Sequence, residues 1–184
     1  MCKICEEYPV YEFTNKRKLC KNCFIKYFQK KALYIIRKFN MILEGDAIYY
    51  KKNKDVRGVV LEDILKMYSE KAFVNLVLVK NKKYTKIAVS DSLDLNSVEF
   101  IKEIIEEDIL DKKVENFLPV CGNVIKPLFL FSDKEILLYA KIRNLIFKPD
   151  KQKFDKIILF VNDLEKKHPE IKQAVLNSYL KLFG

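Results

Sequence analysis

Apolar residues recur at helical spacings between residues 21 and 40, where Phe24, Tyr27, Phe28, Ile35 and Phe39 alternate with basic residues. This period predicts one long helix, followed by a turn near residues 41–46. We expect its aromatic side to pack against the rest of the protein and not to form an exposed platform for nucleic-acid bases.

Further along the chain, short β-branched or apolar runs predict strands, and longer periodic stretches predict helices. Ser132 with Glu135, and Asn96 with Glu99, have the spacing of a helix-capping box. Residues 119–122 are predicted to form a turn. The expected strands are 47–51, 73–80, 86–89 and 128–131, and the expected helices are 58–68, 97–108, 133–145, 154–167 and 170–182. Strands that alternate with helices favour an α/β fold, with a parallel sheet covered by helices.

Length and composition suit one small module followed by one domain. The chain has 184 residues, of which 49% are hydrophobic, enough for a sizeable core. We predict a metal-binding finger at 1–27, a linking basic helix at 28–45 and a shortened α/β domain at 46–184. The apolar runs of the chain are too short to cross a membrane. A chain that starts with a pair of metal ligands also leaves no secretory signal, so we expect a cytoplasmic protein.

Two short cysteine pairs occupy the N-terminal region: Cys2 with Cys5, and Cys20 with Cys23. Two residues between paired cysteines let both sulfurs reach one ion, and two such knuckles complete a tetrahedral site. Between them lie a strand-like run at 8–13 and a turn at 15–18, as in a zinc ribbon or treble-clef-like finger. We predict a structural zinc ion, because four thiolates leave no position open for water.

Two alternatives to zinc remain. The four cysteines could form two disulfides, or they could be reduced thiols that share a spacing by chance. Disulfides within a C-x-x-C pair are usually redox-active and belong to a thioredoxin-like βαβ unit, which the sequence lacks at this point. A reducing compartment is also the better match for four cysteines committed to a metal.

Positive charge is concentrated at the N-terminus. The formal net charge of the chain is +10, and residues 1–40 hold ten lysines and arginines against three glutamates. A basic surface of this kind attracts polyanions through release of counterions, so RNA or DNA is the expected ligand. Solvated lysines that only keep the protein soluble are the alternative. The expected contact residues are Lys26, Lys30, Lys31, Arg37 and Lys38.

The order of these features resembles the archaeal and eukaryotic tRNA 2-thiolation enzymes, which are PP-loop ATP pyrophosphatases. The resemblance lies in the finger, in the helix from Phe24 to Ile42 and in the Gly45-Asp46 pair. It continues through residues 86–108 and 126–140 and ends near 164–176. It implies a PP-loop-type α/β domain, an enzyme ancestor that adenylates a uridine and replaces its oxygen with sulfur, and tRNA as the partner.

The chain departs from the family where the chemistry is done. Family members follow the Gly-Asp pair with a strand and a Ser-Gly-Gly-x-Asp-Ser loop that holds ATP phosphates. Here residues 47–55 contain no glycine pair, and Gly58 alone cannot form that loop. Of the second nucleotide motif only Leu93 and Asp94 match.

The family's mid-chain cysteine pair and later cysteine, which commonly hold an iron–sulfur cluster, have no counterpart here. We therefore expect neither ATP nor an iron–sulfur cluster as a cofactor.

Other candidate residues carry weaker signals. Cys121 is the one cysteine outside the two pairs, and we interpret it as a packed structural thiol. His168 precedes Pro169 at a helix boundary and is expected to be structural or exposed. Asp91 and Asp94 could bind Mg²⁺, but capping of a helix is the favoured role. No nucleophile, base and orienting group can be combined from this sequence.

Three functions follow from these observations. The first is a pseudoenzyme of the PP-loop superfamily that binds tRNA, or pairs with itself or with an active paralogue, through its basic N-terminal module. The second is a zinc-ribbon regulator or scaffold that does not bind RNA. The third is a divergent tRNA-modifying enzyme that binds a nucleotide through an unfamiliar loop around residues 51–57.

Overall fold

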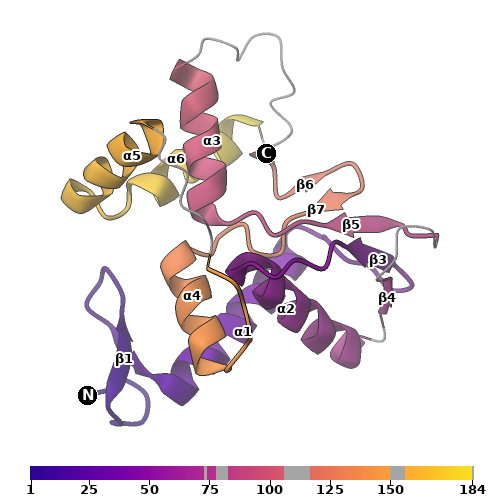
Figure 1. The fold of residues 1–184 in the computed structure, drawn as a ribbon, viewed down its shortest axis with the longest axis horizontal. Helices are drawn as coiled ribbons and strands as arrows, with labels where there is room; N and C mark the ends of the chain where they lie inside the picture. Colours follow the sequence, from indigo (N-terminus) through magenta and orange to yellow (C-terminus); the bar gives the residue numbers. More distant parts are fainter. Residues whose placement is uncertain (73, 78–82, 106–116, 150–155, 184) are drawn as a thin grey trace.

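The N-terminal finger is a two-stranded hairpin that continues directly into a long helix. The structure, a computed structural model, describes residues 1–72, 74–77, 83–105, 117–149 and 156–183. Strands β1 (Pro9–Glu12) and β2 (Lys18–Cys20) are antiparallel, and helix α1 (Lys21–Lys38) begins at the residue after β2. Figure 1 shows the finger at one end of the molecule, with α1 running from it towards the sheet.

Helix α1 ends two residues earlier than expected because Asn40 adopts a left-handed conformation, with φ of 47°. The N–H of Asn40 donates to the carbonyl of Arg37, and the N–H of Met41 donates to that of Ile36. This pair of hydrogen bonds is a Schellman motif, in which Asn replaces the more usual glycine.

The main sheet has five strands in the order β4-β3-β5-β7-β6. The first four strands in this order are parallel, and the edge strand β6 is antiparallel to β7. The strands are β3 (Ala47–Tyr50), β4 (Asn75–Val77), β5 (Lys86–Ala88), β6 (Val120–Cys121) and β7 (Val124–Ile125). The expectation of a parallel sheet with helical cover is confirmed. The predicted strand at 73–80 is only partly within the described residues.

Five further helices complete the fold. They are α2 (Val56–Ala72), α3 (Leu93–Ile105), α4 (Asp133–Ile142), α5 (Lys156–Lys167) and α6 (Ile171–Phe183). Helices α1, α2 and α4 pack on one another, and α3, α5 and α6 form a second group (Figure 1). None of the described helices is long and apolar enough to cross a membrane.

Three sequence predictions were wrong in detail. Residues 128–131 form a turn and not a strand, since Phe129 and Phe131 donate to the carbonyls of Lys126 and Leu128. Their apolar character reflects burial: Leu128 and Phe131 belong to the main core, and Phe129 belongs to a second cluster with Leu93 and Leu176. The predicted turn at 119–122 instead contains β6, and its chain reversal is centred on Gly122, whose φ of 57° suits glycine.

The third error concerns the start of α3. The helix begins at Leu93, one turn before the expected Ser97, because the Ser92 hydroxyl accepts from the N–H of Leu95. Asn96 is buried inside the helix and caps nothing. By contrast, the capping box of α4 is confirmed: Ser132 Oγ accepts from the N–H of Glu135, and the Glu135 carboxylate accepts from the N–H of Ser132.

One core connects the finger to the sheet. Buried residues form a continuous cluster from Cys20 and Phe24 to the strand residue Ile48 and the α4 residue Tyr139. Phe28 of α1 stacks on both Phe131 and Tyr139, at centroid distances of 4.1 Å each. The aromatic side of α1 is therefore core, as its spacing predicted.

Candidate metal centre and nucleic-acid interface

The four cysteines of the two pairs lie together in the finger. Their sulfur atoms all lie within 4.8 Å of one another and could hold a metal ion. Cys5 Sγ is 3.4 Å from Cys20 Sγ and 3.6 Å from Cys23 Sγ. All four are free thiols in this structure, and only Cys5 is exposed. The arrangement matches the metal-binding prediction and not a pair of disulfides.

Backbone hydrogen bonds shape the first knuckle around these sulfurs. The N–H of Glu6 donates to the carbonyl of Cys2, and Glu6 has a φ of 63° that turns the chain back towards β1. The N–H of Lys3 donates to the carbonyl of Lys18, which ties the knuckle to β2. The second knuckle is held by its position at the start of α1, where Cys20 is the N-cap residue.

Crowding of four thiols shifts their pKa values in opposite directions. Burial raises the pKa of the Cys23 thiol to about 12, and the neighbouring thiols of Cys5 and Cys20 add to the effect. Burial also opposes ionisation of Cys2, but hydrogen bonds from the backbone at Cys20, Ile4 and Cys5 outweigh it and lower the pKa of Cys2 to about 6. The ligand set therefore still carries protons at neutral pH, and a bound cation would displace them.

Four of the five residues expected to contact nucleic acid are exposed on α1. Lys26, Lys30 and Arg37 lie on one side of the helix, and Lys38 is exposed near its end. Lys31 differs: its side chain is 22% exposed, and its amine lies 2.9 and 3.1 Å from the two carboxylate oxygens of Glu135. The structure thus places Lys31 in an internal ion pair between α1 and α4.

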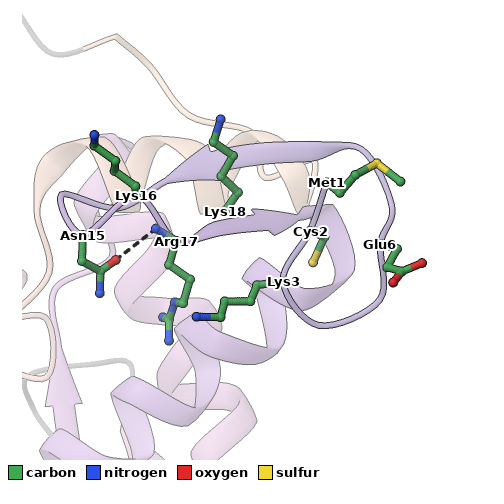
Figure 2. Close-up of a pocket in the computed structure, with 8 residues that line it drawn as sticks. All are labelled: Met1, Cys2, Lys3, Glu6, Asn15, Lys16, Arg17 and Lys18. Carbon is green, nitrogen blue, oxygen red and sulfur yellow. Dashed lines mark hydrogen bonds between the residues drawn. The ribbon is translucent and has the colours of Figure 1, made fainter.

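Two hollows border the finger. One, of about 620 Å³, lies between the finger and α1, and is lined by Arg17, Lys26, Tyr27, Lys30 and Tyr34 among others. The other, of about 480 Å³, lies beside the first knuckle and the 15–18 turn, and its lining includes Lys3, Lys16 and Lys18 (Figure 2). Arg17 lines both hollows.

Arg17 is the residue that sequence reasoning missed. Its guanidinium lies 4.3 Å from the Phe13 ring centroid and 5.4 Å from that of Tyr27. Its Nε is buried, and no described group accepts the Nε hydrogen. The basic run at residues 16–18 was the only sequence signal, and it could not show which of the three would stack on the aromatic rings.

At the carboxyl edge of the sheet, where an open α/β sheet binds its ligands, described side chains form hydrogen bonds and ion pairs with other residues of the chain. Asp55 Oδ1 accepts from the N–H of Gly58 at 2.8 Å, so a carboxylate already occupies the N-terminus of α2. A Cβ on Gly58 would lie 2.6 Å from the Cβ of Asn53, which leaves no space at this turn. Arg57 Nε pairs with Asp133 at 3.0 Å.

The two aspartates considered for Mg²⁺ pair with buried lysines. Lys126 lies 3.0 Å from Asp91 and 2.7 Å from Asn96 Oδ1. Lys172 contacts both Asp94 and Glu165. Asp94 also accepts from the N–H of Asp133, so it caps α4 and not its own helix. Lysine amines thus hold the positions that a cation would take.

Cys121 and His168, the remaining candidates, have no partner among the described residues that suggests chemistry. Cys121 lies half-buried in β6. His168 is exposed between α5 and α6, where its backbone N–H donates to the carbonyl of Leu164. Both positions agree with the structural roles expected from the sequence.

The α/β fold, with its mostly parallel sheet, is like that of a solved tRNA thiolase. Among solved structures, the chain is similar to "U34-tRNA thiolase NcsA from Methanococcus maripaludis with its [4Fe-4S] cluster". The TM-score is 0.76 at 15% sequence identity, and the match covers 98% of this chain and 86% of that chain. No protein-family model and no curated protein matches the sequence. At this identity the likeness shows the fold.

Proposed function

We propose that this protein is a non-catalytic relative of the tRNA thiolases that binds tRNA through its finger and α1. The observation that carries the proposal is a contrast between two surfaces. Lys3, Lys16, Lys26 and Lys30 line two hollows beside the finger and α1 and have no acidic partner among the described residues, whereas described charged side chains at the carboxyl edge of the sheet form internal ion pairs. The likeness of this fold to that of a tRNA thiolase supports tRNA as the ligand.

The absence of catalysis in this proposal rests on charge. A nucleotide phosphate at the N-terminus of α2 would meet the Asp55 carboxylate, which already accepts the N–H of Gly58. Arg57 forms an ion pair with Asp133 and so is not available to a phosphate. Burial raises the pKa of Asp133, although the charge of Arg57 lowers it. Since a phosphate would have to displace a charge-matched internal partner, ATP binding is not expected.

We further propose zinc as the metal. In a tetrahedral site with Zn–S bonds of about 2.3 Å, the sulfurs lie about 3.8 Å apart. The observed separations of 3.4 and 3.6 Å, with all four sulfurs within 4.8 Å, support a single ion. The ligand sulfurs of a four-iron cluster bind separate irons and lie further apart. The zinc would hold the two knuckles together and perform no chemistry.

Binding of labelled tRNA by fluorescence anisotropy over a salt series tests the RNA proposal. We expect affinity to fall steeply as salt rises, with a preference for tRNA over duplex DNA. Equal weak binding to both nucleic acids, or none, would overturn it. Thermal melting with millimolar ATP and Mg²⁺ tests the enzyme alternative, because a ligand that binds the folded state raises the melting temperature. We expect no shift.

A protein partner is the second candidate, supported by exposed apolar residues on the finger. Ile4 and Tyr8 are 69% and 89% exposed, and such residues are common where proteins associate. The partner would be a second copy of this chain or an active thiolation paralogue in the cytoplasm. Purification from native cells, followed by mass spectrometry and RNA sequencing, would identify either class of partner.

A further inference from the structure

Arg17 is the one described residue that lines both hollows beside the finger. The larger hollow is lined by four cations, and the described residues that line it include no carboxylate. In the smaller hollow Glu6 is the one carboxylate among the lining residues. A surface of this composition repels acidic groups of its own chain and attracts an external anion.

Arg17 is held in place for such a contact. Its backbone N–H donates to Asn15 Oδ1 at 3.1 Å, and Lys16 has a φ of 61°, which together fix the turn. The guanidinium lies over Phe13 at 4.3 Å, and its Nε is buried without an acceptor among the described residues, so contact with an external group falls to its terminal amino groups. A planar, pre-oriented guanidinium suits a phosphate, whose oxygens accept two hydrogen bonds at once.

A second cation approaches Arg17 from the first knuckle. Figure 2 shows the Lys3 and Arg17 side chains extending to the same side of the finger, with their terminal nitrogens directed towards one another. Lys16 and Lys18 point to the opposite side in this view, and Lys18 pairs with Glu12 at 3.2 Å. Two like charges that converge without a carboxylate between them are stabilised by an anion placed there.

An aromatic side chain lies at the other end of the larger hollow. Tyr34 of α1 is 59% exposed, whereas Tyr27, which also lines the hollow, is half-buried and donates its hydroxyl to Glu135. Tyr34 has no such structural role, and the Lys38 amine lies 5.9 Å from its ring centroid. An exposed tyrosine within a basic hollow offers a stacking surface for an unpaired base.

We infer that the hollow between the finger and α1 binds one unpaired nucleotide of RNA, with its base stacked on Tyr34 and its phosphate held by Arg17, which Lys3 approaches from the neighbouring hollow. The inference rests on the proposed RNA-binding function and specifies where and how that binding occurs. It requires single-stranded or loop RNA, because the bases of a duplex are stacked on one another and cannot reach Tyr34.

The test is anisotropy of a labelled, short uridine-only RNA and of a matched RNA duplex with Y34A, Y34F, R17A and R17K. Loss of base stacking weakens binding roughly 5- to 100-fold, so Y34A should lose that factor on the single strand and little on the duplex, while Y34F keeps wild-type affinity. We expect both Arg17 variants to weaken binding, because lysine lacks the planar fork. K167A, which removes an exposed charge on α5 outside both hollows, is the control.

Different results separate the failure of this inference from that of the proposed function. If the wild-type protein binds neither these RNAs nor tRNA, the proposed function fails; if it binds tRNA but neither short RNA, the nucleotide site is wrong and the function stands. The nucleotide site is wrong, and the function stands, if the wild-type protein binds RNA and Y34A binds the single strand as tightly as the wild type does. The same holds if the wild-type protein prefers the duplex and Y34A leaves that preference unchanged. Arg17 packs on Phe13, so R17A could disturb the finger itself. The R17A result counts only if its metal content and melting temperature match those of the wild type; otherwise the Y34A result alone tests the nucleotide site.

Discussion

Lys31 of α1 and Glu135 of α4 form an ion pair with an Nζ–Oε2 distance of 2.9 Å, and the same carboxylate completes the capping box of α4. Glu135 is only 6% exposed, and it also accepts from the Tyr27 hydroxyl at 3.1 Å. One buried carboxylate thus fixes the start of α4 and the position of α1 against it.

Replacing Glu135 should therefore destabilise the whole protein. E135A leaves the Lys31 amine partly buried without a partner and removes half of the capping box. Breaking a buried pair and losing a cap together cost about 3 kcal/mol or more. Urea denaturation would measure it. K134A, at the exposed neighbouring position, should change stability by less than about 0.5 kcal/mol. Equal effects of the two would contradict this role.

The neighbours Lys30 and Lys31 should have opposite phenotypes. Lys30 is exposed beside the hollow, so K30A should reduce RNA affinity and lower the slope of log affinity against log salt by about 1, with unchanged stability. K31A should reduce stability because it leaves Glu135 buried without its cation. Parallel anisotropy and melting experiments would show the split, and a stable K31A that loses RNA binding would refute it.

Removal of the metal should unfold the finger. C23S, or treatment with a strong chelator, removes the link between the two knuckles, and we expect the melting temperature to fall by roughly 10 °C or more, since each kcal/mol corresponds to about 2–4 °C in a domain of this size. C121S is the matched control because Cys121 lies in β6, away from the cluster. It should retain the metal content and the melting temperature of the wild type.

Metal affinity should fall as the pH falls. Burial raises the pKa of Cys23 to about 12, and the pKa of Cys20 is also raised by burial and by its neighbouring thiol and carboxyl groups, although a backbone hydrogen bond at Cys23 opposes this. Both thiols are therefore protonated without metal and must release a proton on binding. The release of these two protons alone lowers the affinity about 100-fold for each pH unit lowered near neutrality. The pKa of Cys2, about 6, adds a further proton only at lower pH. Competition with a zinc indicator at several pH values measures the slope, and a slope near zero would contradict it.

Features that depend on residues close together in the sequence were predictable, whereas contacts between residues far apart in the sequence were not. Ser132 and Glu135 were found from sequence because a capping box depends on two residues three apart. The true start of α3 was missed because Asn96 has the sequence context of an N-cap residue. Its amide oxygen instead accepts a hydrogen bond from the amine of Lys126, 30 residues away. Lys31 looked like its neighbour Lys30 until Glu135, 104 residues away, was placed beside it.

The same limit applied to the candidate site. The four ligand cysteines were predictable because each knuckle has its own spacing, whereas the stacking of Arg17 on Phe13 depends on how the hairpin meets α1. At the carboxyl edge of the sheet, the sequence showed only that residues 47–55 lack the glycine pair of a phosphate-binding loop. The residues that close this edge, from Asp55 to Lys172, are distributed along the chain.

The stacking of Phe28 between Phe131 and Tyr139 has a mechanical consequence. A finger joined by a flexible linker could adopt many orientations, but this finger continues into α1, which is packed in the core of the α/β domain. The proposed RNA ligand, bound on the finger, would therefore be held at a fixed orientation relative to the α/β body.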